Sequence, residues 1–252
     1  MKKWFIYGAM FVGVYLSFVI ATIPAHWVIG QIKLPKGLVI ESINGSIWSS
    51  TITQLTYIAP NQRPYTINNV NVSLNSLSVL LLNPSADVTF GYALAKGPEG
   101  SLTISGLTDS LTLKNVDILL AANDIAQQLT LPMPIEAHDY IKINVASFVV
   151  GKPICQSLEG LISWQKASVS ALDEKVKLGA LKASLSCEEG ALALTIDPLN
   201  DMGLSFTAYV RQNSQVSGNG FLKPADKFPE QLTGLLPFLG DKDSKGRYRL
   251  AF

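Results

Sequence analysis

Hydrophobic and polar residues follow two different patterns along the chain. Residues 4–23 carry no charge and are almost all apolar, which predicts one long helix in an apolar environment. In much of the remaining chain, apolar and polar residues alternate, as in 70–74, where Asn71 and Ser73 separate Val70, Val72 and Leu74. A period of two indicates a β-strand with one apolar and one polar face. The chain therefore divides into an N-terminal helical segment and a β-rich body.

The alternating segments are short, numerous and separated by glycine, asparagine and proline. They include residues 70–74, 111–113, 116–120, 141–145, 158–164, 181–187, 192–196, 204–210 and 248–252. Many short strands at short spacing favour an antiparallel sheet over a parallel sheet with crossover helices. We therefore expect a mainly β fold, in which an antiparallel, curved, β-rich domain follows the N-terminal helix.

Two short helical segments interrupt the strand pattern. Residues 123–129 can form a helix opened by an asparagine or aspartate cap, and residues 229–239 a second one that Gly240 ends. The stretch EGSLTISGLTDSLTL from residue 99 also resembles EGALALTIDPLNDMGLSF from residue 189. We expect one β-rich body over residues 28–252, with two similar halves dividing near 132–150 as a further hypothesis.

The uncharged run has the length and the flanks of a membrane span. At about 1.5 Å per residue it covers roughly 30 Å, the thickness of the hydrocarbon layer. Trp4 and Trp27 stand where interfacial aromatic residues are usually found, and Lys2 and Lys3 precede the run. These features predict a membrane anchor over residues 1–27, with a cytoplasmic N-terminus by the positive-inside rule.

A cleaved signal peptide is the alternative to an anchor. Its apolar region is shorter, about 7–15 residues, and ends in a small-residue cleavage site. Here residues 21–23 run into Pro24 without such a site, which favours an uncleaved anchor. The body beyond it, about 225 residues, is then exported and is long enough for a substantial core.

The composition excludes nucleic acid as a partner. The chain is 48% hydrophobic and 15% charged, with a formal net charge of +1. It has no run of lysine or arginine interleaved with aromatic residues, so the electrostatic footprint of a nucleic-acid-binding surface is missing. The partner that the sequence indicates most directly is the membrane.

Cys155 and Cys187 are the two cysteines, and both lie in the exported part within strand-like segments. An oxidising compartment would pair them, so we expect a disulfide. Two buried free thiols are the alternative. The distance between them in the sequence fits no zinc-binding motif.

The sequence offers no set of catalytic side chains. His26 lies at the edge of the apolar run and His138 in a loop before a strand, and neither has a motif partner. Nucleophile-elbow, phosphate-loop and dinucleotide-binding motifs are all missing from the sequence. We expect no enzyme activity, no metal and no cofactor, with a triad assembled only in space as the alternative.

The stretch Gly45-Ser46-Ile47-Trp48-Ser49 resembles the G-T-x-W-S-G signature of the type II secretion system protein N family. Further stretches resemble that family at 70–90 (VNVSLNSLSVLLLNPSADVTF), 155–164 (CQSLEGLISW), 178–187 (LGALKASLSC) and 236–252 (LPFLGDKDSKGRYRLAF). The chain departs from the signature in two places, because Ser46 replaces threonine and Ser50 replaces the second glycine.

The resemblance implies a non-enzymatic accessory component of the Gram-negative inner membrane, with its C-terminal domain in the periplasm. Its partners would be other components of the machine that moves folded proteins through the outer membrane. Trp48 and Trp164 both fall within strand alternation, so we expect them to pack in the core.

A lipid-handling protein is the second functional hypothesis. The family is also similar, more distantly, to AsmA-like proteins, in which a curved sheet presents an apolar groove, and phospholipid would then be a partner. The leucine-rich residues 77–82 would suit such a surface. An apolar sheet face is also what any β core requires, so composition favours neither a lipid groove nor a closed core.

Overall fold

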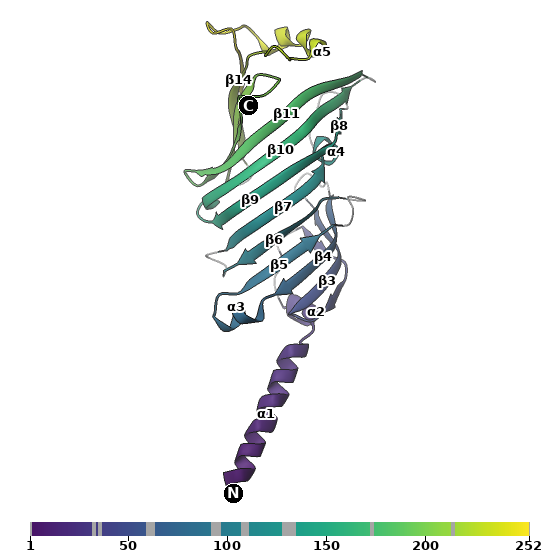
Figure 1. Cartoon of the computed structure of the whole chain (residues 1–252), viewed down its shortest axis with the longest axis vertical. Coiled ribbons are helices and arrows are strands. Elements are labelled where there is room, and N and C mark those ends of the chain that lie inside the picture. The colour runs from purple at the N-terminus through teal and green to yellow at the C-terminus, as the bar shows by residue number, and fades with distance from the viewer. Residues whose placement is uncertain are drawn as a thin grey trace.

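A long antiparallel sheet stands on an N-terminal helix in the computed structural model (Figure 1). The structure describes residues 2–31, 34, 37–58, 64–91, 97–106, 111–127, 135–171, 174–212 and 215–251. The helix projects from one end of the sheet, and the strands follow one another along the long axis of the molecule (Figure 1).

The elements have the following bounds. The helices are α1 (Lys2–Thr22), α2 (Ala25–Ile29), α3 (Ser76–Leu80), α4 (Ala122–Ala126), α5 (Glu230–Thr233) and the 3₁₀ helix η2 (Leu236–Leu239). The strands are β1 (Leu38–Ile40), β2 (Ile43–Gly45), β3 (Ser49–Ile58), β4 (Pro64–Leu74), β5 (Ser85–Phe90), β6 (Glu99–Ser105), β7 (Thr112–Ala121), β8 (Glu136–His138), β9 (Tyr140–Val150), β10 (Cys155–Ala171), β11 (Glu174–Glu188), β12 (Ala191–Ile196), β13 (Leu204–Arg211), β14 (Gln215–Leu222) and β15 (Tyr248–Ala251).

The described strands form one 15-stranded sheet with an almost sequential order. The order is β1-β3-β4-β5-β6-β7-β9-β10-β11-β12-β13-β14-β15, while β2 pairs with β3 and β8 pairs with β10. Every pairing is antiparallel, which short connections between consecutive strands allow. The 17-residue β10 is long enough to pair with β9 along its first part and with β8 near its end.

The register separates an apolar face from a polar face. One row of cross-strand partners runs Val145, Gly160, Leu185, Leu194, Ala208 and Gly218, and a parallel row runs Ile118, Ile143, Ile162, Ala183 and Ile196. On the opposite face a row runs Asp117, Asn144, Leu161, Ser184, Thr195, Thr207 and Asn219. We call the first side, which also carries Val72, Val88 and Leu102, the apolar face.

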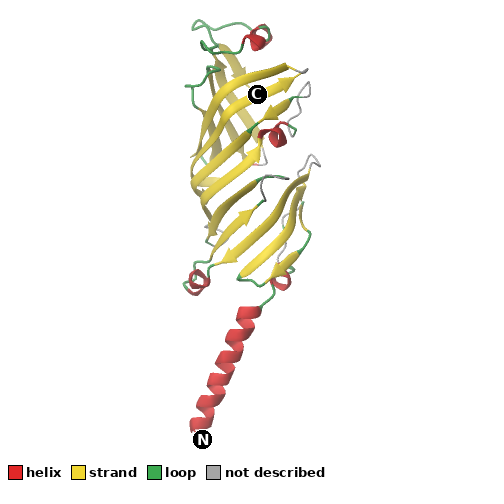
Figure 2. Cartoon of the chain, turned by 45° about the vertical axis from the view of Figure 1, so that its right-hand side comes forward, coloured by secondary structure: helices red, strands yellow, loops and turns green. Residues whose placement is uncertain are grey.

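The sheet is a single layer. Figure 2 shows the helices as α1 and short pieces at the ends and margins of the sheet, and the described strands belong to one sheet that curls along its length. Among the described residues no large side chain is fully buried. The buried apolar cluster of that part of the chain lies at the last strands, where Leu236 of η2 packs with Leu222 and Tyr248. Most of the apolar face therefore consists of half-buried side chains.

Bulges interrupt the ladder at several places. The register shifts between Ser101 and Thr103 in β6, and twice between Trp164 and Ser168 in β10. Asn115 in β7 adopts a φ of 51°, opposite the first of these shifts. Because an extra residue bends its strand and increases the local twist, these bulges help the sheet curve along its length.

The main expectation from the sequence, a mainly antiparallel β fold with few helices, is confirmed. The nine predicted strand segments fall within β4, β7, β9, β10, β11, β12, β13 and β15, apart from single end residues, and 111–113 and 116–120 belong to one strand, β7. Phe252 lies outside the described residues. The division into two similar halves stays a prediction.

The helical expectations are partly wrong. The helix predicted over 123–129 is α4, which begins at Ala122 without a side-chain cap, because its N-cap residue is Ala121. The amide oxygen of Asn123, inside the helix, accepts a hydrogen bond from the Ala137 N–H at 3.2 Å. Residues 128 and 129 lie outside the described part. The helix predicted over 229–239 is split into α5 and η2, because Pro237 cannot continue an α-helical ladder. The sequence pattern did not predict α2 and α3.

The membrane span expected over α1 is not confirmed. Within the described residues, none of the helices combines the length and the apolar character that a membrane crossing requires.

A disulfide joins Cys155, at the start of β10, to Cys187, near the end of β11. Cys155 is 2% exposed, and the bond closes a loop with a sequence separation of 32 residues. It joins the beginning of β10 to the end of β11, the two longest strands described.

Replacing both cysteines with serine should lower the free energy of unfolding by about 3 to 4 kcal/mol, because the unfolded chain regains the entropy of the closed loop. Urea unfolding of the full chain in detergent micelles, followed by circular dichroism, measures this loss. Reductant should lower the midpoint of the parent protein and leave that of the double variant unchanged. Full alkylation of both thiols in protein taken from cells without reductant would contradict the disulfide.

Candidate functional site: the helix–sheet joint and the apolar face

The Gly45–Trp48 stretch forms the tight turn between β2 and β3. Gly45 has a φ of 100°, and a Cβ at this position would collide with the carbonyl oxygen of Ser49. The Ser46 N–H closes the turn by donating to the same oxygen at 3.0 Å. Glycine is required here by the left-handed conformation and by the close approach of the backbone.

This turn is bound to the end of α1. The indole Nε1 of Trp48 donates to the carbonyl oxygen of Ile20 at 3.0 Å, and the Ile47 N–H donates to the carbonyl oxygen of Ile23 at 3.0 Å. Ile20 lies in the last turn of α1, where carbonyl groups have no partner within the helix. Pro24 also forms a bridge with Ser46. We call these contacts the helix–sheet joint, and they explain why the motif needs a tryptophan with its N–H donor.

The joint continues into the next strands. The carbonyl oxygen of Trp48 accepts a hydrogen bond from the Leu74 N–H at 2.9 Å, at the end of β4. Ser49 pairs with Ser73, and Ser50 pairs with Val72. Ser50, which stands where the family signature has glycine, is 7% exposed, so its small side chain is buried beside the joint.

Trp164 has a comparable anchoring role elsewhere in the sheet. Its side chain is half-buried, and its Nε1 donates to the carbonyl oxygen of His138 at 2.9 Å, which ties β8 to β10. His138 Nε2 lies 2.7 Å from the Ser170 hydroxyl. Neither Trp48 nor Trp164 is fully buried, so each contributes a directed hydrogen bond in addition to partial packing.

The membrane-flanking residues are separated along α1 and α2. The side chains of Trp4 and Trp27 are 84% and 64% exposed, at the beginning of α1 and within α2. Lys2 and Lys3 begin α1, and their side chains are not among those described. Ile6 and Phe11, between the two tryptophans, are 62% and 75% exposed.

The apolar face extends over consecutive strands of the sheet. Its side chains come from consecutive strands and shield one another, so most are half-buried without a covering layer. Its last strands are packed against the segment that contains Phe228 and Leu236. A surface of this kind can bind an apolar ligand or the apolar side of another protein.

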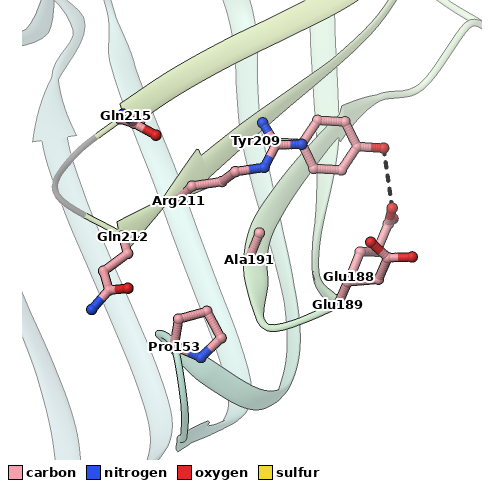
Figure 3. A pocket seen from close by; sticks show the side chains of 8 residues that line it. All are labelled: Pro153, Glu188, Glu189, Ala191, Tyr209, Arg211, Gln212 and Gln215. Carbon is pink, nitrogen blue, oxygen red and sulfur yellow. Dashed lines mark hydrogen bonds between the residues drawn. The ribbon is translucent and has the colours of Figure 1, made fainter.

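A polar pocket of about 580 Å³ lies at the ends of β11 to β14 (Figure 3). The Tyr209 hydroxyl donates to Glu188 at 3.1 Å, and this bond to the carboxylate raises the pKa of Tyr209. The Arg211 guanidinium lies 5.5 Å from the centre of the Tyr209 ring and donates to Ser217 at 2.6 Å. These groups satisfy one another, and the pocket places no activated nucleophile beside a base.

An ion pair stabilises the turn before β15. Arg247 forms an ion pair with Asp243 at 2.8 Å and lies 3.8 Å from the centre of the Phe221 ring. Side-chain and backbone hydrogen bonds from Arg247 hold the pKa of Asp243 at about 2. Among the described residues no group of three or more histidine, cysteine, aspartate or glutamate side chains could hold a metal ion.

Sequence reasoning found the residues of the joint but not their contacts. The signature identified Gly45 and Trp48, whereas the bond to Ile20 joins residues 28 positions apart and could not be read from local alternation. The leucine-rich residues 77–82 were expected to suit a lipid-binding surface, but their place around α3 and their exposure come from the structure. The absence of charge over the whole segment 64–86 is a further signal that the sequence carries.

Comparison with known proteins links the whole chain to one family. The profile of the family described as "Type II secretion system (T2SS), protein N" matches residues 36–251. The chain is 25% identical to the type II secretion system protein N of Aeromonas hydrophila, over 100% of this chain and 98% of the relative. It is 26% identical to that of Vibrio cholerae serotype O1, over 98% and 97%. No solved structure matches the chain.

Replacing Trp48 with phenylalanine should loosen the joint, because the ring is kept while the N–H donor to Ile20 is lost, at a cost of about 1 kcal/mol. Spin labels at Leu16→Cys on α1 and Thr89→Cys on β5 report this as a broader distance distribution, and the disulfide keeps the native cysteines unlabelled.

Trp164→Phe is the matched control, because it also removes an indole hydrogen bond but lies outside the joint. Its distance distribution should equal that of the parent protein. Equal distributions for Trp48→Phe and the parent would show that the indole bond does not fix α1.

Proposed function

Because the chain belongs to the type II secretion system protein N family, we propose that it is a non-enzymatic accessory component of the secretion machine. In this proposal α1 anchors the protein in the bacterial inner membrane, and the sheet stands in the periplasm as a scaffold for other secretion components. Family membership carries the assignment to the secretion system, and the form of the sheet supports the scaffold role.

A periplasmic location is supported by the disulfide between Cys155 and Cys187. Such bonds form and persist in oxidising compartments and are rare in the cytoplasm. Lys2 and Lys3 before the uncharged run favour a cytoplasmic N-terminus, which would leave the sheet on the periplasmic side.

No helix of the described residues meets the requirements for a membrane span. The proposed anchor is therefore supported by the uncharged sequence and by the exposure of the α1 side chains. Residues 4–23 contain no charge. The described apolar side chains of α1 are uncovered, as shown by Phe11 at 75% and Phe18 at 66% exposure. An exposed apolar surface of this extent needs a lipid or protein environment.

The scaffold role is supported by the sheet edges and by the two contrasting faces. β1 and β15 each pair with one strand of the described sheet, and apart from the bridge between Tyr248 and Lys242 they leave backbone groups for a partner strand. The polar face carries side-chain pairs such as Thr51 with Asn71 at 2.8 Å and Thr103 with Asp87 at 2.7 Å. These pairs suit contact with water, whereas the apolar face is available for a partner.

Secretion in a strain that lacks the native gene should be restored fully by His138→Ala and only partly by Trp48→Ala. The Trp48 ring is half-buried, so its loss should cost about 2 kcal/mol, roughly half the value for a fully buried site, in addition to the lost bond to Ile20. The measurement is the amount of a secreted enzyme in the medium, with immunoblots to check the abundance of each variant.

His138→Ala is the control for chemistry, because it removes an imidazole whose side-chain hydrogen bond is made with the Ser170 hydroxyl. A secretion defect in this variant at normal abundance would point to a chemical role and would overturn the non-enzymatic proposal. Normal secretion in the strain without any of the protein would overturn the secretion role itself.

Phospholipid binding is a second candidate function, and the continuous apolar face favours it. Six consecutive strands, β9 to β14, contribute partners to one apolar row, and the strands that the structure describes all belong to this one sheet. Acyl chains are flexible and uncharged, so they could fill such a surface without leaving polar groups unpaired.

A photoreactive phenylalanine analogue at Leu185 should form adducts with phospholipid in cells if the apolar face binds acyl chains. The same residue at Ser184 is the matched control, because the two neighbours point to opposite faces of β11. Mass spectrometry of the purified adducts identifies the lipid. Equal lipid labelling at both positions, or none at Leu185, would contradict a lipid-binding face.

A further inference from the structure

Four exposed leucines lie at the end of the sheet from which α1 projects. Leu77, Leu80, Leu81 and Leu82 are 63%, 80%, 70% and 85% exposed, and we call residues 77–82 the leucine loop. The loop contains part of α3 and connects β4 to β5. Figures 1 and 2 both place α3 beside the upper end of α1. Exposed leucines at this density are unusual on a surface that contacts only water.

The polar groups of this segment are satisfied internally. The Asn75 side chain accepts hydrogen bonds from the N–H groups of Leu77 and Ser78 at 3.0 and 3.3 Å. The Ser78 hydroxyl donates to the Asn75 carbonyl at 2.6 Å and accepts from the Ser85 N–H at 2.8 Å. The Asn83 N–H donates to the carbonyl oxygen of Ser78 at 3.0 Å. The loop is therefore ordered from within and presents mainly apolar side chains outward.

Leu82 combines an unfavourable backbone conformation with an exposed side chain. Its φ is 57°, in the left-handed region that glycine and asparagine occupy more readily. Its side chain is 85% exposed, so little packing compensates for this conformation. An unfavourable backbone conformation that presents an exposed apolar side chain indicates a role outside the folded chain.

A chain of hydrogen bonds fixes the leucine loop relative to α1. Ile20 in α1 accepts from the Trp48 indole at 3.0 Å, and Trp48 accepts from Leu74 at 2.9 Å. Leu74 directly precedes Asn75, which caps α3. The whole segment 64–86 contains no charged residue, so no buried charge opposes its entry into an apolar phase.

We propose that the leucine loop inserts into the leaflet of the bilayer that holds α1, as a second membrane contact of the sheet. This inference rests on the proposed anchor, because α1 brings the loop to the lipid surface. Two contacts, joined through Trp48, would fix the tilt of the sheet on the membrane and direct the first strands of the apolar face toward the lipid.

The test uses the full chain reconstituted into vesicles of phosphatidylethanolamine and phosphatidylglycerol. Leu81→Cys carries an environment-sensitive fluorophore, and the native cysteines stay blocked in their disulfide. Leu16→Cys reports on α1. Leu199→Cys, in the turn between β12 and β13 and 90% exposed, is the matched exposed leucine away from the joint. Lipids with a spin label on the acyl chain quench fluorophores that enter the bilayer.

The expected result is a blue-shifted, quenched probe at Leu81 and Leu16, and an unquenched probe at Leu199. A quenched Leu16 probe with an unquenched Leu81 probe would overturn the leucine loop contact and leave the anchor standing. Unquenched probes at both positions would overturn the anchor and this inference together. Protection of the Leu81 probe only when other secretion proteins are added would assign the loop to a protein partner and refute lipid insertion.

Leu80→Gln combined with Leu82→Asn separates a membrane role from a structural role. Asparagine tolerates the left-handed conformation, so the unfolding midpoint should stay equal or rise. The quenching of the Leu81 probe should fall at the same time, while Leu199→Gln changes neither quantity. Unchanged quenching in the double variant would contradict the inference, because two of the three leucines that remain beside the Leu81 probe would be gone.

Discussion

The cohesion of this molecule depends on the continuous antiparallel ladder between its strands. In a two-layer protein the opposing layer buries the apolar face, and this burial is the dominant favourable term in folding. Here the described residues include no fully buried large side chain, and the residues that are deeply buried, such as Val70, Val116 and Ala193, are mostly small. Each inner strand therefore depends on its two neighbours for its backbone hydrogen bonds and for much of its shielding. The disulfide and the cluster around Leu222 and Tyr248 reinforce the part of the sheet farthest from α1 in strand order.

The lack of an opposing layer also makes the apolar face the surface that best indicates what the protein binds. A single layer with one apolar side leaves half-buried aliphatic groups that would gain free energy from a further cover. Acyl chains and the apolar side of a partner protein both satisfy this requirement, so the face by itself does not select between them. The polar pocket near Tyr209 has less to gain from a ligand, because its polar side chains already contact one another. Tyr209 bonds to Glu188, and Arg211 bonds to Ser217 and lies near the Tyr209 ring.

The helix–sheet joint determines how this surface is presented. A helix attached only through a flexible linker would let the sheet rotate freely, whereas hydrogen bonds from Trp48 and Ile47 to carbonyl groups at and just beyond the end of α1 restrict that motion. The tight turn at Gly45 is what brings Trp48 to the helix. Gly45 and Trp48 therefore take part in the connection between α1 and the first strands of the sheet. A scaffold that works at a membrane needs such a connection to keep a constant orientation.

The sequence by itself determined the fold class, the strands and the alternation that separates Val72 from Asn71 and Leu185 from Ser184, because the side-chain period of a strand is local. It also determined the cysteine pair and the signature around Trp48. Only the tertiary structure decided that the apolar residues form one open layer, since alternation is the same in a closed core and in an uncovered sheet. It alone decided that Trp48 bonds to Ile20, that Asn123 bonds to Ala137 instead of capping α4, and that α3 lies at the end of the sheet from which α1 projects. Those outcomes depend on contacts between residues distant in the sequence, which a local pattern does not encode.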